Sequence, residues 1–98
     1  MENTIQNSLP EKYSLILFIA GMSPKSVNAI ENLRRICDKY LPGNFELEII
    51  DININKEQAV SYEIIGIPTL IKTSPNPKRI LIGDLSDTSK VLSILDLN

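Results

Sequence analysis

The sequence lacks histidine and tryptophan and has a single cysteine, Cys37. Without histidine the chain has no imidazole base, no His-ligated zinc site and no Ser-His-Asp or Cys-His nucleophile, unless a partner chain supplies the missing group. One cysteine cannot close a disulfide within the chain or form a Cys-x-x-Cys redox pair. The composition therefore excludes these classes of nucleophilic, redox and zinc chemistry within a single chain.

Long apolar runs and a strong charge of one sign are absent as well. No apolar run approaches the ~20 residues that a membrane-spanning helix needs. Ten basic and twelve acidic residues leave a net charge of -2, which gives no general attraction to nucleic acid or to an anionic membrane. The polar residues 1–10 lack the pattern of a secretory signal. We therefore expect a cytoplasmic protein whose partners include neither nucleic acid nor a membrane.

What is present is enough for one folded domain. The chain has 98 residues, of which 43% are hydrophobic and 22% are charged, close to the averages of globular proteins. Residues 1–12 show little periodicity and are predicted to form a loose leader. Residues 13–98 are predicted to form a single domain.

The first half has the pattern of a β-α-β unit. Residues 14–20 are a nearly continuous apolar run, typical of a buried strand. Ser23 is a candidate N-cap with Pro24 at the first helical position, which predicts a helix to about Leu41. Residues 45–52 alternate apolar with acidic and then become apolar, which predicts a second strand. The apolar stripe of the helix is predicted to consist of Val27, Ile30, Leu33, Cys37 and Tyr40.

The second half has weaker signals. Residues 56–63 predict a short helix, and residues 64–72 predict a strand entered through Gly66 and Pro68. Residues 74–77 predict a turn, and residues 78–82 the hairpin partner of that strand. Ser86 is a candidate N-cap for a last helix that runs to the chain end. The predicted fold class is α/β with the order βαβαββα.

This order, with Gly-Ile-Pro-Thr-Leu at residues 66–70, resembles the thioredoxin-type fold, in which this proline is usually cis. We therefore expect a cis peptide bond at Ile67–Pro68. Thioredoxins carry their dithiol where this chain has residues 21–25, which include no cysteine. A hydroxyl has no comparable redox cycle, so Ser23 is interpreted as a helix cap.

Other polar residues are given structural interpretations. Cys37 lies on the apolar helix stripe and is interpreted as a small core residue. Lys72, Lys78 and Arg79 form a small basic cluster, interpreted as a solvated edge of the hairpin. The acidic residues of the second half lack the spacing of an EF-hand loop, so no metal site is predicted.

From Tyr13 to Leu97 the chain resembles the KaiB family of small clock proteins. The motifs that carry the resemblance are residues 20–27 (AGMSPKSV), 50–51 (ID), 68–70 (PTL), 82–87 (IGDLSD), 90–92 (KVL) and 95–97 (LDL). The resemblance implies a non-enzymatic regulatory protein in clock-like or stress-adaptation signalling, with no catalytic residue and no cofactor. It also implies a homo-oligomer, dimer or tetramer, that binds a KaiC-like ATPase or a signalling kinase.

The resemblance further implies two folds. In the alternative KaiB ground-state packing the first half is retained and the C-terminal half is rewired, which requires two packings within a few kcal/mol of each other. Pro68 is expected to set the strand geometry. Ile94 replaces a glycine that clock members have in the last helix, so we expect it to alter the balance between the two folds.

Five residues are predicted to contact the partner: Glu48, Glu63, Lys78, Arg79 and Asp96. The last three match the clock members of the family. Elsewhere, basic residues of those members are replaced in this chain by Ile16, Asn28, Glu48 and Glu63. If those cations meet an acidic surface of the ATPase, the two charge reversals oppose binding.

Two alternatives stay open at this point. One is a monothiol thioredoxin-like redox protein that uses Cys37. The other is a sensor-kinase docking module that keeps the thioredoxin-like state permanently.

Overall fold

The computed structural model describes residues 11–97, and the order of elements is the predicted βαβαββα. Residues 1–10 of the predicted leader lie outside the described residues, and Glu11 and Lys12 are exposed. The elements are β1 (Tyr13–Ile19), α2 (Pro24–Tyr40), β2 (Phe45–Asp51), α3 (Lys56–Ser61), β3 (Thr69–Ser74), β4 (Arg79–Ile82) and α4 (Thr88–Ile94).

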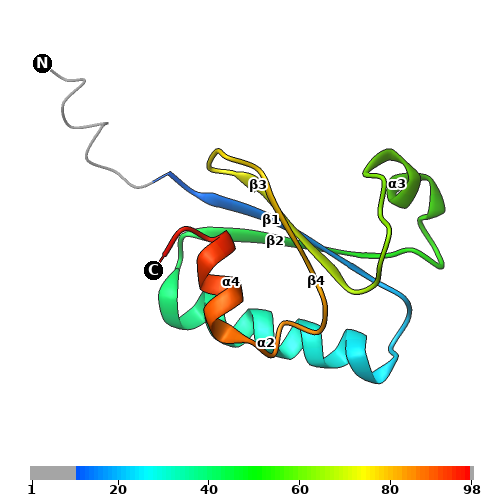
Figure 1. Cartoon of the computed structure of the whole chain (residues 1–98), viewed down its shortest axis with the longest axis horizontal. Helices are drawn as coiled ribbons and strands as arrows, with labels where there is room; N and C mark the ends of the chain where they lie inside the picture. Colours follow the sequence, from blue (N-terminus) through cyan, green and yellow to red (C-terminus); the bar gives the residue numbers. More distant parts are fainter. Residues whose placement is uncertain (1–10, 98) are drawn as a thin grey trace, which may run out of the picture.

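The strands form one mixed sheet in the order β2-β1-β3-β4 (Figure 1). β1 pairs in parallel with β2, with Leu17 opposite Ile49, and antiparallel with β3, with Leu17 opposite Leu70. β3 and β4 form an antiparallel hairpin. A parallel pair requires a long crossover connection, and α2 provides it. β1 and β3 therefore lie in the centre, and β2 and β4 are the two edges.

The predicted start of α2 is confirmed. The Ser23 hydroxyl accepts a hydrogen bond from the Ser26 amide at 3.3 Å, and Pro24 occupies the first turn. The predicted stripe is wrong in part, because Tyr40 is 39% exposed and Val27 is only half-buried. The residues that α2 buries are Ser26, Ala29, Leu33, Ile36 and Cys37.

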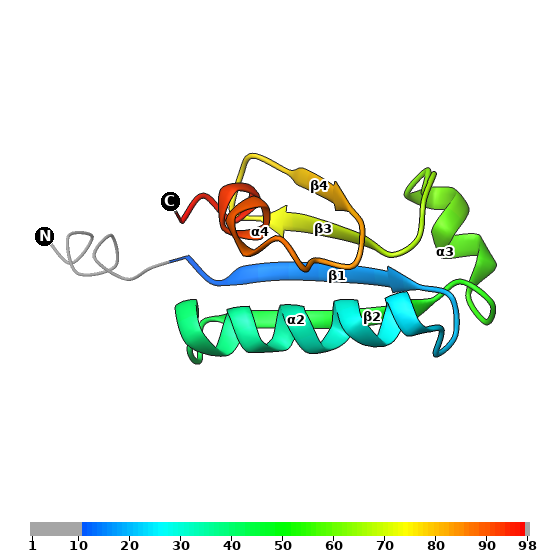
Figure 2. The same ribbon diagram turned by 60° about the horizontal axis from the view of Figure 1, so that its bottom comes forward.

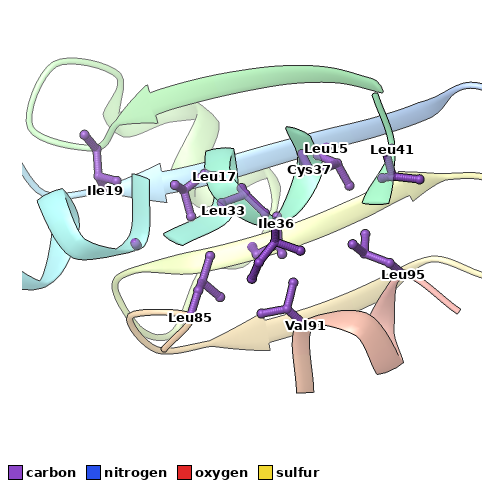
Figure 3. Close-up of a cluster of buried hydrophobic side chains, with 12 residues drawn as sticks. Leu15, Leu17, Ile19, Leu33, Ile36, Cys37, Leu41, Leu85, Val91 and Leu95 are labelled. Atoms are coloured by element: carbon purple, nitrogen blue, oxygen red, sulfur yellow. The ribbon is translucent and has the colours of Figure 1, made fainter. Parts of the chain in front are cut away.

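The main core lies between the sheet and the two longer helices. α2 and α4 cover the same face of the sheet, whereas α3 lies beyond the ends of β1 and β2 (Figures 1 and 2). Leu15, Leu17 and Ile19 of β1 point toward α2, and Val91 of α4 closes the cluster (Figure 3). Each fully buried side chain of this size contributes roughly 1.5–3 kcal/mol, so this cluster is the main source of stability.

The opposite face of the sheet, here called the open face, has a smaller core of Ile16, Phe18, Ile50 and Ile71. The Tyr62 ring lies on this face with its centroid 5.5 Å from that of Phe18. α3 itself buries no residue. The cover of the open face therefore comes from the segment that follows α3, which contributes Tyr62, Ile64 and Ile67.

The predicted strand at 64–72 is confirmed only from Thr69 onward. The peptide bond between Ile67 and Pro68 is cis, as expected. Pro68 has no N–H for the sheet, but its carbonyl accepts a hydrogen bond from Gly83 at 2.9 Å, the first backbone bond of the hairpin. Residues 64–68 therefore form an irregular segment that leads into β3 and are not part of the strand.

The predicted cap of the last helix is wrong by one residue. The Asp87 carboxylate accepts a hydrogen bond from the Lys90 amide at 3.3 Å and caps α4. The Ser86 amide is itself bound by the Asp84 side chain at 3.1 Å. The helix also ends at Ile94 and not at the chain end, because Asp96 has a φ of 59°, outside the helical region.

Candidate interaction surface

The junction between β1 and α2, which carries the dithiol in thioredoxins, is occupied by capping interactions. The Ser23 hydroxyl donates to the Ser26 hydroxyl at 2.9 Å, and the Ser26 hydroxyl accepts from the Ala20 amide at 3.2 Å. The Gly21 amide donates to the Asp51 carboxylate at 3.1 Å. The hydroxyls and amides of this junction therefore hold the helix in place, which is a structural role.

Cys37 lies inside the main core and is fully buried. Burial, and secondarily the charge of Asp38, raises the pKa of the Cys37 thiol to about 12. A redox thiol must reach its reactant and ionise near neutral pH. The interpretation of Cys37 as a core residue is thus confirmed, and the monothiol redox alternative fails on both requirements.

Two of the predicted partner residues, Arg79 and Asp96, lie together at the end of α4. The Asp96 carboxylate is 3.2 Å from the Arg79 guanidinium and 2.8 Å from the Lys72 ammonium. The hydrogen bonds from Lys72 and Arg79 hold the pKa of Asp96 below its usual value. The result is a compact carboxylate cluster, defined by Lys72, Arg79 and Asp96, of which only the last two are exposed.

Lys72 departs from the predicted solvated hairpin edge, because its side chain is 0% exposed while that of Asp96 is 41% exposed. Lys72 alternates with Ile71 and therefore faces α4, where it closes the main core. A buried ammonium needs a hydrogen-bonded counter-charge, which Asp96 supplies. The alternation of residues along β3 could have predicted this burial, because it places Lys72 on the same face of the sheet as Leu70.

The other three predicted partner residues lie apart from this cluster. Lys78 is exposed at the turn before β4, with its ammonium 5.8 Å from the centre of the Tyr62 ring. Glu63 is exposed beside Tyr62, with a φ of 56°. Glu48 is exposed on β2, and its alternation with Ile50 places it on the open face. Glu48, Glu63 and Lys78 thus lie on or beside the open face, whereas Arg79 and Asp96 pair at the end of α4, so the five residues do not form one contiguous site.

Four positions of this chain hold other residues where the clock members have basic ones, and these positions differ in their exposure to solvent. Ile16 is only 8% exposed and belongs to the core of the open face, so it is unavailable to a partner. Asn28, Glu48 and Glu63 are exposed. Any effect of the replacements on binding must therefore come from these three.

An exposed apolar area on the open face was not anticipated from the sequence. Ile80 and Ile82 of β4 are 52% and 49% exposed, and Ile65 beside them is 88% exposed. Together with Tyr62, Glu63, Ile64 and Thr69 they line a shallow hollow. We call Ile65, Ile80 and Ile82 the β4 patch. Natural sheet edges are usually blunted by charge or by a covering element, so an apolar edge of this kind indicates a contact surface.

Within 11–97 there is no group of three or more carboxylate or thiol side chains placed to hold a metal ion. In the same range, none of the helices has the length and apolar character required to cross a membrane.

The fold and the sequence were compared with known proteins. The N-terminal domain of Synechococcus elongatus SasA superimposes with a TM-score of 0.72 at 21% identity, covering 92% of this chain and 89% of that one. Fasciola hepatica thioredoxin superimposes with a TM-score of 0.71 at 15% identity, covering 99% and 91%. At these identities the likeness shows the fold alone, and it confirms the predicted thioredoxin-like class.

Sequence relatives show more. The circadian clock oscillator protein KaiB of Gloeothece citriformis is 42% identical over 91 residues, which is 93% of this chain and 86% of the relative. KaiB of a Picosynechococcus species is 43% identical over 91 residues, covering 93% and 88%. The KaiB domain matches residues 16–97. The chain therefore belongs to the KaiB family of circadian clock proteins, which are non-catalytic regulators.

Proposed function

We propose that this chain is a cytoplasmic KaiB-like regulator that self-associates and binds a KaiC-type ATPase or a signalling kinase, in clock-like or stress-adaptation signalling. The observation that carries the proposal is the match to KaiB over residues 16–97. The geometry supports it, because the junction that is catalytic in thioredoxins holds only a Ser23 cap and the thiol of Cys37 is buried.

The distribution of exposed charge suggests what the partner surface carries. Glu48 and Glu63 are both exposed, so a partner with cations opposite them would be attracted and an acidic partner repelled. Arg79 and Asp96 already neutralise one another in the carboxylate cluster. Glu48 and Glu63 are therefore the residues with which this chain selects among KaiC-like ATPases.

A kinase-docking module is the second candidate. Its support is the fold shared with the N-terminal domain of SasA, which covers 92% of this chain. Such a module would keep the thioredoxin-like state and remain monomeric. The regulator and the module therefore differ in self-association and in the choice of partner.

Size-exclusion chromatography with light scattering tests the proposal. The chain is measured alone, and then with the KaiC-like ATPase and nucleotide, or with the sensor kinase, from the same organism. We expect an oligomer alone and a co-eluting complex after addition. The double variant Glu48→Lys and Glu63→Lys should change the affinity for that partner, and Glu31→Lys on the outer side of α2 is the matched control. An oligomer that co-elutes with neither protein would contradict the proposal.

A further inference from the structure

The strand β4 leaves the backbone groups of its outer side unpaired. β3 pairs with its inner side, and within residues 11–97 no strand or helix lies beyond it (Figure 2). The Gly83 amide donates to the Pro68 carbonyl, and hydrogen-bonded positions alternate along an antiparallel pair, so Leu81 also bonds toward β3. The amides and carbonyls of Ile80 and Ile82 therefore point outward.

The hollow beside the β4 patch has a size that selects among ligands. Its volume is about 110 Å³, and Ile65, Ile80 and Ile82 line it together with Tyr62 and Glu63. Pockets for small organic ligands enclose roughly 300–1,000 Å³. The hollow is therefore too small for a cofactor or metabolite of that kind and has room for a single apolar side chain.

One added strand would meet both the hollow and the free backbone groups. Ile80 lies opposite Ile71, a core residue of the open face, and Ile82 lies opposite Thr69, which also lines the hollow. The side chains of Ile80 and Ile82 are therefore on the open face, and about half of each is exposed. A strand on the outer side of β4 would bond the outward amides, and its side chains opposite Ile80 and Ile82 would lie over the hollow.

Glu63 gives the hollow a negative charge. Its side chain lines the hollow and is exposed. Among residues 11–97, no ammonium or guanidinium lies within ion-pair distance of it. The Lys78 ammonium lies instead over the Tyr62 ring, 5.8 Å from its centre. The group that complements Glu63 is therefore a cation on the bound segment.

From these features we propose that the outer edge of β4 binds an extended segment of a different protein, which adds to the sheet as an antiparallel strand. The segment seats one large apolar side chain in the hollow and brings an arginine or lysine, two positions away, to Glu63. Side chains two positions apart share one face of a strand, and antiparallel pairing is the more stable kind. The inference rests on the proposed function, because it names a surface with which the chain binds its partner.

A second copy of this chain is a poorer occupant of the edge. If its β4 paired there, its own Glu63 would come to the same face of the joined sheet as the first Glu63. If its β2 paired there, the exposed Glu46 and Glu48 would approach Glu63 from the open face. Like charges brought together across a contact oppose binding. The acidic character of both edges therefore favours a basic segment from another protein.

A nuclear magnetic resonance titration of the full chain tests the inference. The probe is a synthetic peptide, acetyl-Thr-Arg-Thr-Leu-Thr-Arg-Thr-amide, in which one leucine has an arginine two positions away on each side. The arginine stems can cover apolar surface while their charged heads reach Glu63. We expect amide shifts that saturate and that concentrate at Ile65, Ile80 and Ile82, while the signals of α2, on the other face of the sheet, stay unchanged.

Backbone methylation of the peptide separates strand addition from simple apolar contact. In the proposed pairing the leucine amide points toward β4, whereas the amides of the two neighbouring threonines point away. N-methylleucine at the centre should therefore abolish the saturable shifts. N-methylation of one neighbouring threonine is the matched control and should leave them in place.

Two variants test the side-chain contacts. Glu63→Gln should weaken binding of the arginine peptide by about twofold to fivefold, the value of an exposed ion pair, and should not affect a peptide with glutamine in place of both arginines. Glu31→Gln, on α2, is its control. Ile80→Thr should weaken binding by about fivefold, because it removes apolar surface next to the hollow. Ile54→Thr is its control, since Ile54 is 77% exposed and does not line the hollow.

Three results would overturn the inference. The first is a peptide that causes no saturable shifts, and the second is binding that survives N-methylation of the leucine. The third is a set of shifts at Ile80 and Ile82 that grows with protein concentration in the absence of peptide, because a second copy would then occupy the edge. Co-elution with the ATPase or the kinase is measured separately, so the proposed function can stand or fall independently of this surface.

Discussion

At the residue scale, Asp96 stands out because it holds two cations while its own backbone is in the left-handed region. Its φ is 59°, which residues other than glycine seldom adopt. The Lys72 ammonium 2.8 Å away is buried and depends on this carboxylate for its charge partner. The carboxylate cluster thereby ties the end of α4 to β3 and β4.

Replacing Asp96 by Asn should destabilise the chain at pH 7, and the effect should shrink as the pH falls below about 3.9. The folded-state pKa of Asp96 lies below its unfolded value of about 3.9, so its contribution is present above that value and is lost as pH falls through the folded pKa. Urea unfolding of both proteins at several pH values measures the difference between their free energies of unfolding. Asp38→Asn, on the exposed side of α2, is the control. A difference in free energy of unfolding that does not change with pH would contradict the role of Asp96 as a charged partner of Lys72 and Arg79.

Cys37 should be chemically inert in the folded chain. With a pKa of about 12, roughly one thiol in 10⁵ is ionised at pH 7, and the side chain is fully buried. Mass spectrometry after iodoacetamide treatment should show no modification in buffer and complete modification in denaturant. Cys37→Ser should cost about 1–3 kcal/mol of stability, since it leaves a hydroxyl in the apolar core. Rapid alkylation of Cys37 in the folded chain would contradict the burial of its side chain.

At the element scale, the N-termini of α2 and α4 are each capped by a single side chain. Ser23 caps α2 and Asp87 caps α4. Each accepts a hydrogen bond from an amide that has no partner within the helix. These caps set where each helix begins.

Asp87→Ala should lower the free energy of unfolding by about 1 kcal/mol, the usual cost of losing an N-cap. Ser86→Ala should change it by less than about 0.5 kcal/mol, because the Ser86 side chain does not cap the helix and its hydrogen bond to the Asp84 carboxylate comes from an exposed residue. Urea unfolding measures both variants, and each serves as the reference for the other. Equal losses would mean that the cap is shared between the two residues.

At the scale of the whole molecule, the two halves differ in how much they bury. β1 is buried from Leu15 to Ile19, and α2 buries five residues. α3 buries none, α4 buries only Val91 within its bounds, and three of the four β4 residues are exposed. β3 is the exception in the second half, because Thr69 to Lys72 are buried. α3, β4 and α4 are therefore the elements that an alternative packing would reorganise at lowest cost.

Ile94→Gly should shift the chain toward the alternative KaiB packing of the second half. Glycine is about 1 kcal/mol worse than alanine within a helix, which changes a ratio of two states by about fivefold. Nuclear magnetic resonance should then show a second set of signals for residues beyond about 56, with those of β1, α2 and β2 little changed. Ile94→Ala removes the same packing without the backbone effect and is the control. A variant that simply unfolds would contradict the prediction.

Much of the fold was predictable because its signals are local. The Ser23-Pro24 helix start, the alternation of β2 and the turn at residues 74–77 each depend on neighbours within a few positions. The cis Ile67–Pro68 bond followed from the family resemblance. Element boundaries in the second half were less predictable, since β3 begins at Thr69, where pairing with Phe18 of β1 and Ile82 of β4 begins.

By itself, the sequence determined the family, the order βαβαββα and the absence of a catalytic dithiol, since each is written in residue types and their spacing. Only the tertiary structure decided that Lys72 is buried against Asp96, and that Ile80 and Ile82 line a free edge. The reason is physical: the environment of a side chain depends on what the fold brings against it from distant positions. Asp96 meets Lys72 across 24 residues of chain, and no local pattern records such a contact.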